Sequence, residues 1–268
     1  MRTVICHFYN ESYLLPWWLN HHKNIFDHGI MINHRSTDSS VDIIKTITPQ
    51  WEIVDTRLSE FDAFMTDLEV MNYEEGVKGF KIALTVTEFL MSTIPLEEIE
   101  RAILGLGRLG CAASGIICVD HNPLEFPVYE RPLQAQKYWG YDDNLILDPQ
   151  SRLNAGQSLF PYRNRFYHTN KVGMYYPGRH LSHHQDATFR MNELMIFHYG
   201  YAPWNDLFLK RKLQIQEKIS SGDKARNWGF QHFKGYEELD IDFQKQRGLS
   251  LDLQSHPFAN EALKRWCS

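Results

Sequence analysis

The sequence predicts an α/β fold in which a central, mostly parallel sheet is flanked by helices. Short apolar runs rich in β-branched residues alternate with segments whose apolar residues recur at helical spacing, and this alternation is typical of right-handed βαβ crossovers. Hydrophobic residues make up 43% of the 268 residues and charged residues 23%, which is ordinary for a protein that buries a real core.

The first third of the chain supplies the clearest alternation. In chain order it predicts a strand over residues 3–8, a helix from Leu14 that Gly29 ends, a strand over 29–33, a helix that Ser36 or Asp38 can cap, and a strand over 51–54. This order favours the nucleotide-binding class of α/β folds.

The remaining elements follow the same reasoning with weaker signals. They are a helix over 59–75 with Phe61, Phe64, Leu68 and Met71 facing inward, a strand over 80–86, a helix over 97–109, a strand over 115–119, a strand over 195–201 and a helix over 203–219. A region rich in Pro, Asn and Tyr lies between 121 and 180, and loops of that length usually carry function. We expect one domain over 1–219 and a helical, loop-rich C-terminal extension over 220–268 that packs on it.

Charge and cysteine usage exclude several classes of protein. The formal net charge is −5, so the chain lacks the broad basic surface that sequence-independent nucleic-acid binding needs. Its four cysteines show no CxxC spacing, which argues against a zinc knuckle or a disulfide framework. No apolar run approaches the length of a membrane span, and we expect a cytoplasmic protein.

The segment CHFYNESYLLPWWLNHHKNIFDHGIMINHRSTDSSVDII, residues 6–44, resembles the opening of GT-A glycosyltransferases of the family-2-like branch. The matching positions are Asn10, Glu11, Trp18, Leu19, His22, Ser36, Thr37 and Asp38. The resemblance implies a GT-A (Rossmann-like) fold and transfer of a sugar from a nucleotide-sugar donor, with UDP as the expected nucleotide, to a saccharide hydroxyl. It also implies that Asn10, Glu11 and Asp38 help to bind the nucleoside, although Asp38 could serve only as a helix cap.

The stretch GFKIALTVTEFL is similar to the strand of that family that ends in Asp-x-Asp-Glu-Phe, where the aspartates hold a divalent ion. Here Thr85 and Thr87 replace both aspartates, whereas Glu88 remains. Two interpretations stay open. Either Glu88 and His198 hold a Mn²⁺ or Mg²⁺ ion, or cationic side chains replace the ion. Neutral hydroxyls are poor ligands for a hard cation, which favours the second interpretation.

Two later segments, GRHLSHH (178–184) and FHYGYAPWNDLFLKRK (197–212), resemble the late Gly-x-His and His-Tyr motifs of the same branch. The resemblance implies that His180 and His198 approach the diphosphate, and we add Lys210 as a candidate. The basic run 210–212 could equally be a solvated helix face. His183 and His184 are adjacent on an expected strand, and neighbouring strand residues face opposite ways, so they are not a promising metal pair.

An inverting transfer needs a base for the acceptor hydroxyl, and Glu88 and Asp186 are the two candidates. The retaining alternative stays open. Thr85 and Thr87 are expected beside the diphosphate or sugar of the donor.

Two other function classes remain open. A catalytically silent relative that binds nucleotide or glycan is credible because both aspartate positions are threonine. A histidine-rich, metal-dependent hydrolase is weaker, since no HExxH or similar spacing gathers several ligands.

Overall fold

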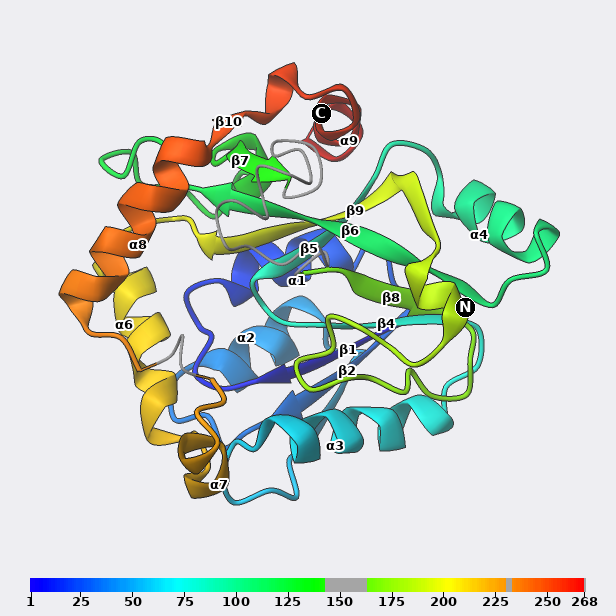
Figure 1. Ribbon diagram of the computed structural model, residues 1–268, viewed down its shortest axis with the longest axis horizontal. Coiled ribbons are helices and arrows are strands. Elements are labelled where there is room, and N and C mark those ends of the chain that lie inside the picture. The colour runs from blue at the N-terminus through cyan, green and yellow to red at the C-terminus, as the bar shows by residue number, and fades with distance from the viewer. Residues whose placement is uncertain (143–162, 230–232, 268) are drawn as a thin grey trace.

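A ten-stranded sheet with helices on both faces forms the centre of the protein (Figure 1). The structure, a computed structural model, describes residues 1–142, 163–229 and 233–267, so part of the expected loop region, 143–162, lies outside the described residues. The strands are β1 (Arg2–Phe8), β2 (His28–Asn33), β3 (Glu52–Asp55), β4 (Phe80–Leu84), β5 (Glu88–Ser92), β6 (Gly110–Val119), β7 (Trp139–Asp142), β8 (Arg165–His168), β9 (Arg190–Tyr201) and β10 (Leu251–Asp252). Their order is β10-β7-β6-β8-β4-β1-β2-β3, and β9 pairs with both β5 and β6.

Seven of these ten strands run in one direction. β3, β2, β1 and β4 form parallel neighbours, and β6, β9 and β10 follow the same direction because the strands between them and β4 run the opposite way. The strands β5, β7 and β8 are the antiparallel ones. The predicted α/β fold with a central, mostly parallel sheet flanked by helices is therefore confirmed.

Two apolar cores lie on the two faces of the sheet. Along β1 the side chains alternate, so that Val4, Cys6 and Phe8 join the larger core and Ile5 joins the smaller one. The larger core also contains residues of α1 (Leu15–His22), α2 (Ser40–Ile47), α4 (Leu96–Gly105) and α9 (Pro257–Cys267). The smaller core lies beneath α3 (Ala63–Glu75), which crosses the lower part of Figure 1.

The helix α1 hydrogen-bonds the backbone of β5 with its side chains. Trp18 Nε1 donates to Glu88 O over 2.8 Å, His21 Nε2 lies 2.8 Å from Leu90 O, and Leu90 N donates to His22 Nε2 over 3.1 Å. Among the described strands β5 pairs with β9 alone, so these side chains occupy the edge where another strand would pair. Burial lowers the pKa of His21 to about 4, which keeps its imidazole neutral at this apolar contact. Buried packing is thus the role of both histidines.

The predicted inward face of the helix over 59–75 is confirmed only in part, since Met71 packs against the smaller core but Phe64 does not. The helix begins at Ala63, and Phe64 is 48% exposed. The residues that α3 buries are Thr66, Asp67, Glu69, Val70 and Glu74, most of which are polar. The apolar spacing misleads here because three buried carboxylates have partners elsewhere in the chain, as described below.

The helices after β9 lie along one side of the molecule, at the left of Figure 1. They are α6 (Asp206–Gln214), α7 (Ser221–Ala225) and α8 (Tyr236–Leu249), while α9 packs against β5 and β9. Short 3₁₀ turns connect the elements at Leu133–Ala135, Gln185–Thr188, Ile215–Glu217 and Leu253–Ser255. Within the described part of the chain, no helix has the length and apolar character needed to cross a membrane.

The close approach of β2 to Trp51 gives a test of the larger core. A Cβ atom on Gly29 would lie 2.2 Å from Cε3 of Trp51, a ring that is itself buried. We expect Gly29→Ala to lower the free energy of unfolding by about 1–3 kcal/mol, since the ring cannot move aside in a packed core. Urea denaturation measures the change.

The matched control is Gly105→Ala at the exposed end of α4, where an added Cβ meets no atom within 4 Å. It should be neutral or stabilising by up to about 1 kcal/mol. Equal stability of Gly29→Ala and the wild type would contradict the described contact with Trp51.

Candidate active site

The turn between β4 and β5 carries the three residues that the sequence placed at the end of a strand. Thr85 Oγ1 lies 2.9 Å from Thr87 Oγ1, so the two hydroxyls share one hydrogen bond. The Glu88 carboxylate reaches back to accept a hydrogen bond from Thr85 N over 2.8 Å. The three side chains therefore lie together at the carboxyl end of β4, which is where ligands gather in open α/β sheets.

Glu88 forms a buried, two-pronged ion pair with Arg165. Arg165 Nε lies 2.8 Å from one carboxylate oxygen of Glu88 and a terminal guanidinium nitrogen lies 2.7 Å from the other. The Glu88 side chain has no exposed surface and that of Arg165 is 3% exposed. The Nε contact is a hydrogen bond, whereas the second contact is an ion pair without a hydrogen bond, and both oxygens of the carboxylate thus lie against the guanidinium.

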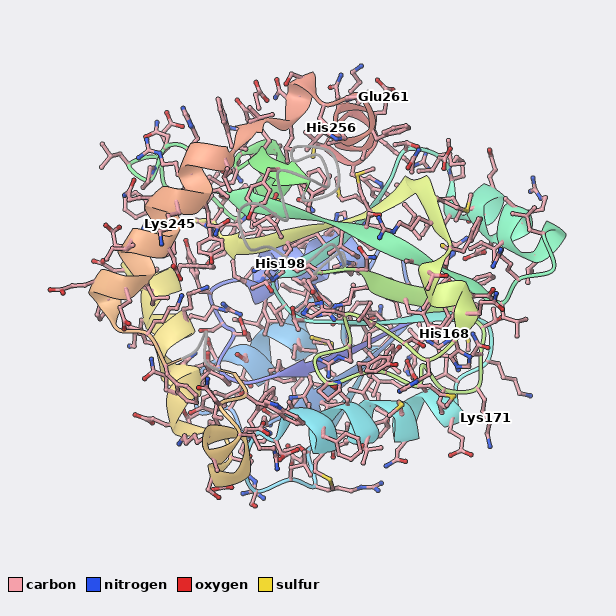
Figure 2. The ribbon with its side chains drawn as sticks, in the orientation of Figure 1. His168, Lys171, His198, Lys245, His256 and Glu261 are labelled. Atoms are coloured by element: carbon pink, nitrogen blue, oxygen red, sulfur yellow. The ribbon has the colours of Figure 1, made fainter. Side chains whose placement is uncertain are left out.

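More cationic groups surround this pair. Arg165 also donates to Gly178 O over 2.7 Å, which brings the 177–180 loop to the site. On the adjacent strand, His198 is paired in register with Glu88, and its Nδ1 lies 2.9 Å from a guanidinium nitrogen of Arg163. Figure 2 shows His198 near the middle of the molecule. A basic cluster therefore lies at this strand end.

Burial and these arginines keep both histidines of the cluster neutral. Burial lowers the pKa of His180 well below its usual value, and Arg165, Arg163 and Arg179 lower it further. For His198 the causes are burial and then Arg163 and His180. Nδ1 of His180 is buried and has no hydrogen-bond partner among the residues described. The cluster thus combines fixed positive charge with neutral imidazoles that can donate or accept a hydrogen bond.

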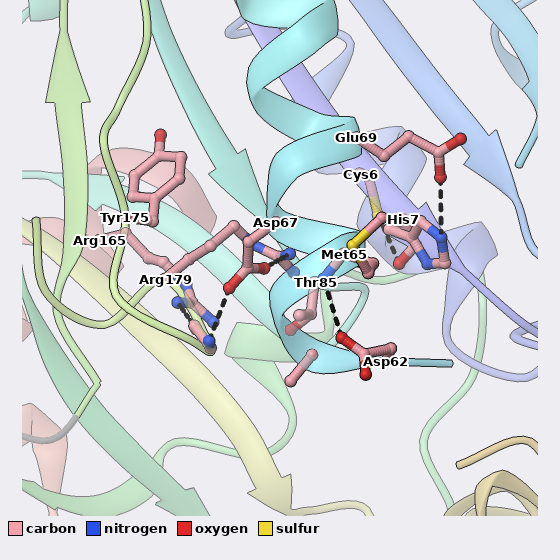
Figure 3. A network of polar contacts seen from close by, with 12 residues as sticks. Cys6, His7, Asp62, Met65, Asp67, Glu69, Thr85, Arg165, Tyr175 and Arg179 are labelled. Carbon is pink, nitrogen blue, oxygen red and sulfur yellow. Dashed lines mark hydrogen bonds and ion pairs between the residues drawn. The ribbon is translucent and has the colours of Figure 1, made fainter. Parts of the chain in front are cut away.

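The helix α3 holds the loop that contributes Arg179 and His180. Asp67 accepts a hydrogen bond from Gly178 N over 2.7 Å and forms a buried ion pair with Arg179, as Figure 3 shows for the two side chains. Two turns further along α3, Glu74 accepts from Tyr175 Oη over 2.5 Å. Gly178 and Arg179 both have positive φ angles, 92° and 60°. The buried carboxylates of α3 thus fix a strained loop at the site.

The residues expected to bind the nucleoside form a second group next to the first. Asn10 Oδ1 accepts from Thr37 N over 2.7 Å and from Asp38 N over 3.3 Å. Glu11 forms a two-pronged ion pair with Arg211 of α6. Burial raises the pKa of Glu11, and the Arg211 guanidinium opposes that shift. These polar groups join the ends of β1 and β2 to α6.

Asp38 serves as a local cap as well as a link between loops. Its carboxylate accepts from Ser40 N and from Ser12 N, each over 3.0 Å. Burial opposes ionisation, but the hydrogen bonds from Ser40 and Ser12 prevail and lower the pKa of Asp38. Asp38 therefore accepts the first backbone N–H of α2, although the N-cap position itself is Ser39, and its contact with a nucleoside stays a hypothesis.

Cys6 connects the two groups in space. Burial raises the pKa of its thiol well above the usual value, and the charges of Glu11, Arg179, Glu88 and Arg211 all act on it. Carboxylates and arginines from both groups therefore lie around one point near the end of β1. The structure places eight of the ten predicted site residues in these two groups and places the other two, Asp186 and Lys210, elsewhere.

Asp186 lies at the opposite end of the strands, away from the Thr85–Glu88 turn. It accepts from Arg108 over 2.9 Å and from Leu109 N over 2.8 Å, beside the first residue of β6. That residue pairs with His168, which pairs with Lys81 at the start of β4. The prediction of Asp186 as a base at the strand ends is therefore wrong, because its position lies at the other end of β4.

The sequence also placed Lys210 beside the diphosphate, but the structure places it on the exposed side of α6. Its side chain is exposed, whereas the next two basic residues of α6, Arg211 and Lys212, turn toward the rest of the protein. Lys212 Nζ donates to Gly200 O over 3.0 Å. Residues along a helix are about 100° apart around its axis, so a run of three basic residues cannot share one environment.

A ring-lined cluster at the ends of β1 and β2 was not predicted. The rings of His7, His34 and Phe61 lie within 5.2–6.1 Å of one another, centroid to centroid, and Tyr9 adds an edge contact to His34. His34 is 1% exposed, and neither of its ring nitrogens has a partner within the described ranges. Burial and His7 lower the pKa of His34 to about 4, so the ring is neutral.

Sequence reasoning also missed the arginines. Arg163 and Arg165 are two residues apart at the start of β8, and such residues face the same side of a strand, so the pattern RNR was an available signal. Arg179 follows the glycine of the motif that had already drawn attention to His180. Asp67 and Glu69 carried no such signal, since acidic residues on a helix are usually solvated.

The residues at this strand end do not fit a divalent ion. Thr85 and Thr87 offer neutral hydroxyls, Glu88 is occupied by Arg165, and Nδ1 of His198 faces a guanidinium. In the described part of the chain, no three His, Cys, Asp or Glu residues are grouped so that they could hold a metal. Hard cations need several oxygen ligands of suitable charge, and this site supplies positive charge instead.

No family model matches the chain, and no curated protein matches it. Among solved structures it is similar to TarS (residues 1–349) of S. aureus, with 15% identity and a TM-score of 0.37 over 81% of this chain and 64% of that one. It is also similar to glucosyl-3-phosphoglycerate synthase of Mycobacterium tuberculosis in complex with Mn²⁺, UDP and glucosyl-3-phosphoglycerate, with 13% identity and a TM-score of 0.38 over 67% and 61%. The chain spans about three fifths of the length of these structures. Similarity at this level assigns no activity to the chain.

The carboxylate of Glu69, which pairs with His7 of the ring cluster, gives a pH test of the contacts around that cluster. Burial opposes its ionisation, but His7, Arg57 N and Thr56 together lower the pKa of Glu69 to about 2. A carboxylate with a lowered pKa stabilises the fold above its unfolded pKa of 4.5, and that stability is lost as the pH falls toward 2. We expect Glu69→Gln to be less stable at neutral pH and to lose less stability across this acid range.

Chemical denaturation at a series of pH values measures both effects. The control is Glu60→Gln, because Glu60 is exposed and lies outside the ion pairs of the described residues. Its curve should parallel that of the wild type. An unchanged acid slope in Glu69→Gln would show that the carboxylate is not held in its charged form by these partners.

Proposed function

We propose that the protein is a glycosyltransferase that uses a nucleotide-sugar donor and binds the donor diphosphate with basic side chains, without a divalent ion. The observation that carries this proposal is the buried pairing of Glu88 with Arg165, next to two neutral threonines where the resembling family has metal-binding aspartates. A guanidinium thus stands beside the strand end that would face the diphosphate.

The charge balance of the cluster supports an anionic ligand. Arg165 is neutralised by Glu88 and Arg179 by Asp67. Arg163 and Lys212 have no carboxylate ion pair within residues 1–142, 163–229 and 233–267, so their positive charge is left over. Glycosyl transfer from a nucleotide donor builds negative charge on the departing diphosphate, and fixed positive groups in a site sheltered from water stabilise that charge.

The nucleoside would then lie against the ring-lined cluster of His7, His34 and Phe61. Flat rings suit a nucleobase, and the partly exposed Tyr9 and Phe61 are the rings of the cluster that a base can contact. In this arrangement Asn10, Glu11 and Asp38 shape the loops around the nucleoside, while Thr85 and Thr87 lie toward the diphosphate or sugar. UDP is the expected nucleotide on the strength of the sequence resemblance.

A second candidate function is a nucleotide- or glycan-binding protein without turnover. The engagement of Glu88 by Arg165 favours it, because an ion-paired carboxylate is a poor acceptor for the proton of an acceptor hydroxyl. For the enzyme, His180 is the group with a free nitrogen at the site, and its lowered pKa makes it a weak base.

A thermal-shift screen of UDP, GDP, CMP and dTDP sugars tests the donor and its metal requirement together. A ligand that binds the native state at about 100 times its Kd adds about 2.7 kcal/mol to stability, which a melting curve resolves. We expect one nucleotide class to raise the Tm by the same amount in EDTA and in Mn²⁺. A shift that appears only with Mn²⁺ would overturn the metal-independent site.

Turnover of the selected donor separates the two candidate functions. Release of the nucleoside diphosphate, with or without an added saccharide, identifies the enzyme. Binding without release identifies the silent protein. If no nucleotide sugar shifts the Tm, the enzyme and the nucleotide-binding protein both fail, and if free saccharides give no shift either, the glycan-binding protein fails too.

A further inference from the structure

Lys212 is a half-buried lysine whose ammonium group has fewer partners than those of the fully buried lysines Lys81 and Lys137. Lys81 donates to three backbone carbonyls, at 2.8, 3.0 and 3.1 Å. Lys137 pairs with the Asp120 carboxylate and with a backbone carbonyl, each at 2.8 Å. Lys212 has the single acceptor Gly200 O, although an ammonium group has three donors. Two of its donors are thus left without a described acceptor.

The surroundings of Lys212 add positive charge. Gly200, which it contacts, lies directly against His198 and Arg163, since a Cβ on Gly200 would be 2.7 Å from the His198 ring and 3.3 Å from the Arg163 guanidinium. Arg211 precedes it on α6. The nearest acidic group that acts on it, Asp242 of α8, is already ion-paired with Lys234.

This environment disfavours the charged ammonium in the absence of an anion. Burial, Arg211 and Arg163 lower the pKa of Lys212 to about 7, and Asp242 only partly offsets them. A half-buried cation with one acceptor, beside an Arg163 that has no carboxylate partner among the described residues, is unfavourable without an anion, so its retention suggests a ligand that compensates it. Besides Gly200 O, Nζ lies over the rings of Tyr201 and Phe208, 4.9 and 5.9 Å from their centroids, and neither contact supplies a negative charge.

We propose that Lys212, together with Arg163, binds the diphosphate of the donor and stabilises the nucleoside diphosphate as it leaves. This inference rests on the proposed function. In the transfer, the bond between the anomeric carbon and the diphosphate oxygen breaks and its electron pair stays on that oxygen. The acceptor oxygen bonds to the anomeric carbon, and its proton passes to a base or to water. The Lys212 ammonium keeps its protons and donates hydrogen bonds to the phosphate oxygens.

The first test compares three variants in the binding of inorganic pyrophosphate and UDP-glucose by calorimetry. Lys212→Met removes the charge and should weaken both ligands about tenfold to a hundredfold, as expected for hydrogen bonds to a charged group. Lys212→Arg should retain most of the affinity. Lys210→Met, two residues away on the exposed side of α6, should bind like the wild type.

Two further readouts separate ligand binding from a structural role. Without ligand, Lys212→Met should be as stable as the wild type or more stable, because it removes an under-partnered, half-buried charge. A structural lysine would instead lose stability on this change. UDP-glucose, whose phosphates do not titrate near neutrality, should bind the wild type less tightly as the pH rises through about 7, and Lys212→Arg should lack this dependence because its guanidinium stays charged.

The outcomes separate a failure of the proposed role of Lys212 from a failure of the proposed glycosyltransferase function. If the wild type binds neither probe, the diphosphate site and the proposed function both fail. If the wild type binds both and Lys212→Met binds them equally well, only the role of Lys212 fails. A loss of affinity in Lys212→Met together with a loss of folding stability would also overturn it, and the Lys212→Arg variant then shows whether the fold tolerates a cation there.

Discussion

The buried ion pair of Glu88 and Arg165 is the contact on which the arrangement of the site depends. Glu88 also accepts from Thr85 N, and Arg165 also donates to Gly178 O, so one pair joins the β4–β5 turn, β8 and the 177–180 loop. Removing one partner from a buried pair leaves an uncompensated charge, which typically costs about 3–5 kcal/mol. The pair therefore fixes the geometry strongly. It also removes Glu88 from the groups that could bind a cation.

Pairing with distant partners also explains why α3 can bury carboxylates on the side that faces the sheet. A helix over a sheet normally buries an apolar stripe, but α3 buries Asp67, Glu69 and Glu74. Each has partners that are distant in sequence: Asp67 holds Arg179 and Gly178 N, and Glu74 holds Tyr175. The helix thus anchors a loop whose positive φ angles would be unfavourable by themselves. Burying these carboxylates is tolerable only because the loop supplies their hydrogen bonds.

Because the buried carboxylates depend on partners that are distant in the sequence, only the locally determined features of the fold could be predicted from it. The strand over 28–33 and the helix over 40–47 were predicted, within a residue or so, because the spacing of apolar residues is a local property. Buried strands and amphipathic helices both show that spacing in their own sequence. The inward face of α3 was foreseen only in part, since a carboxylate becomes a core residue only when its partner arrives from about a hundred residues away. The site shows the same division. Thr85, Thr87 and Glu88 were located from a strand end, whereas Asp186 has the right chemistry at the wrong end of the sheet, and no local pattern distinguishes the two.

The three basic residues at 210–212 show the same limit of sequence reasoning for single side chains. Composition marks them as equivalent, but helix geometry sends Lys210 to solvent, Arg211 to Glu11 and Lys212 to the backbone of β9. Among the described residues neither lysine has a carboxylate partner, but Lys210 is exposed to solvent whereas Lys212 is half-buried near Arg163, which also has none there. A pair of aspartates with a bound divalent ion contributes about zero net charge to a diphosphate site, whereas two threonines with two unpaired cations contribute a net positive charge that is part of the chain itself. If the proposed diphosphate site is correct, neutral side chains at 85 and 87 leave this positive charge to the ligand, whereas aspartates near these cations would compete with the ligand for it.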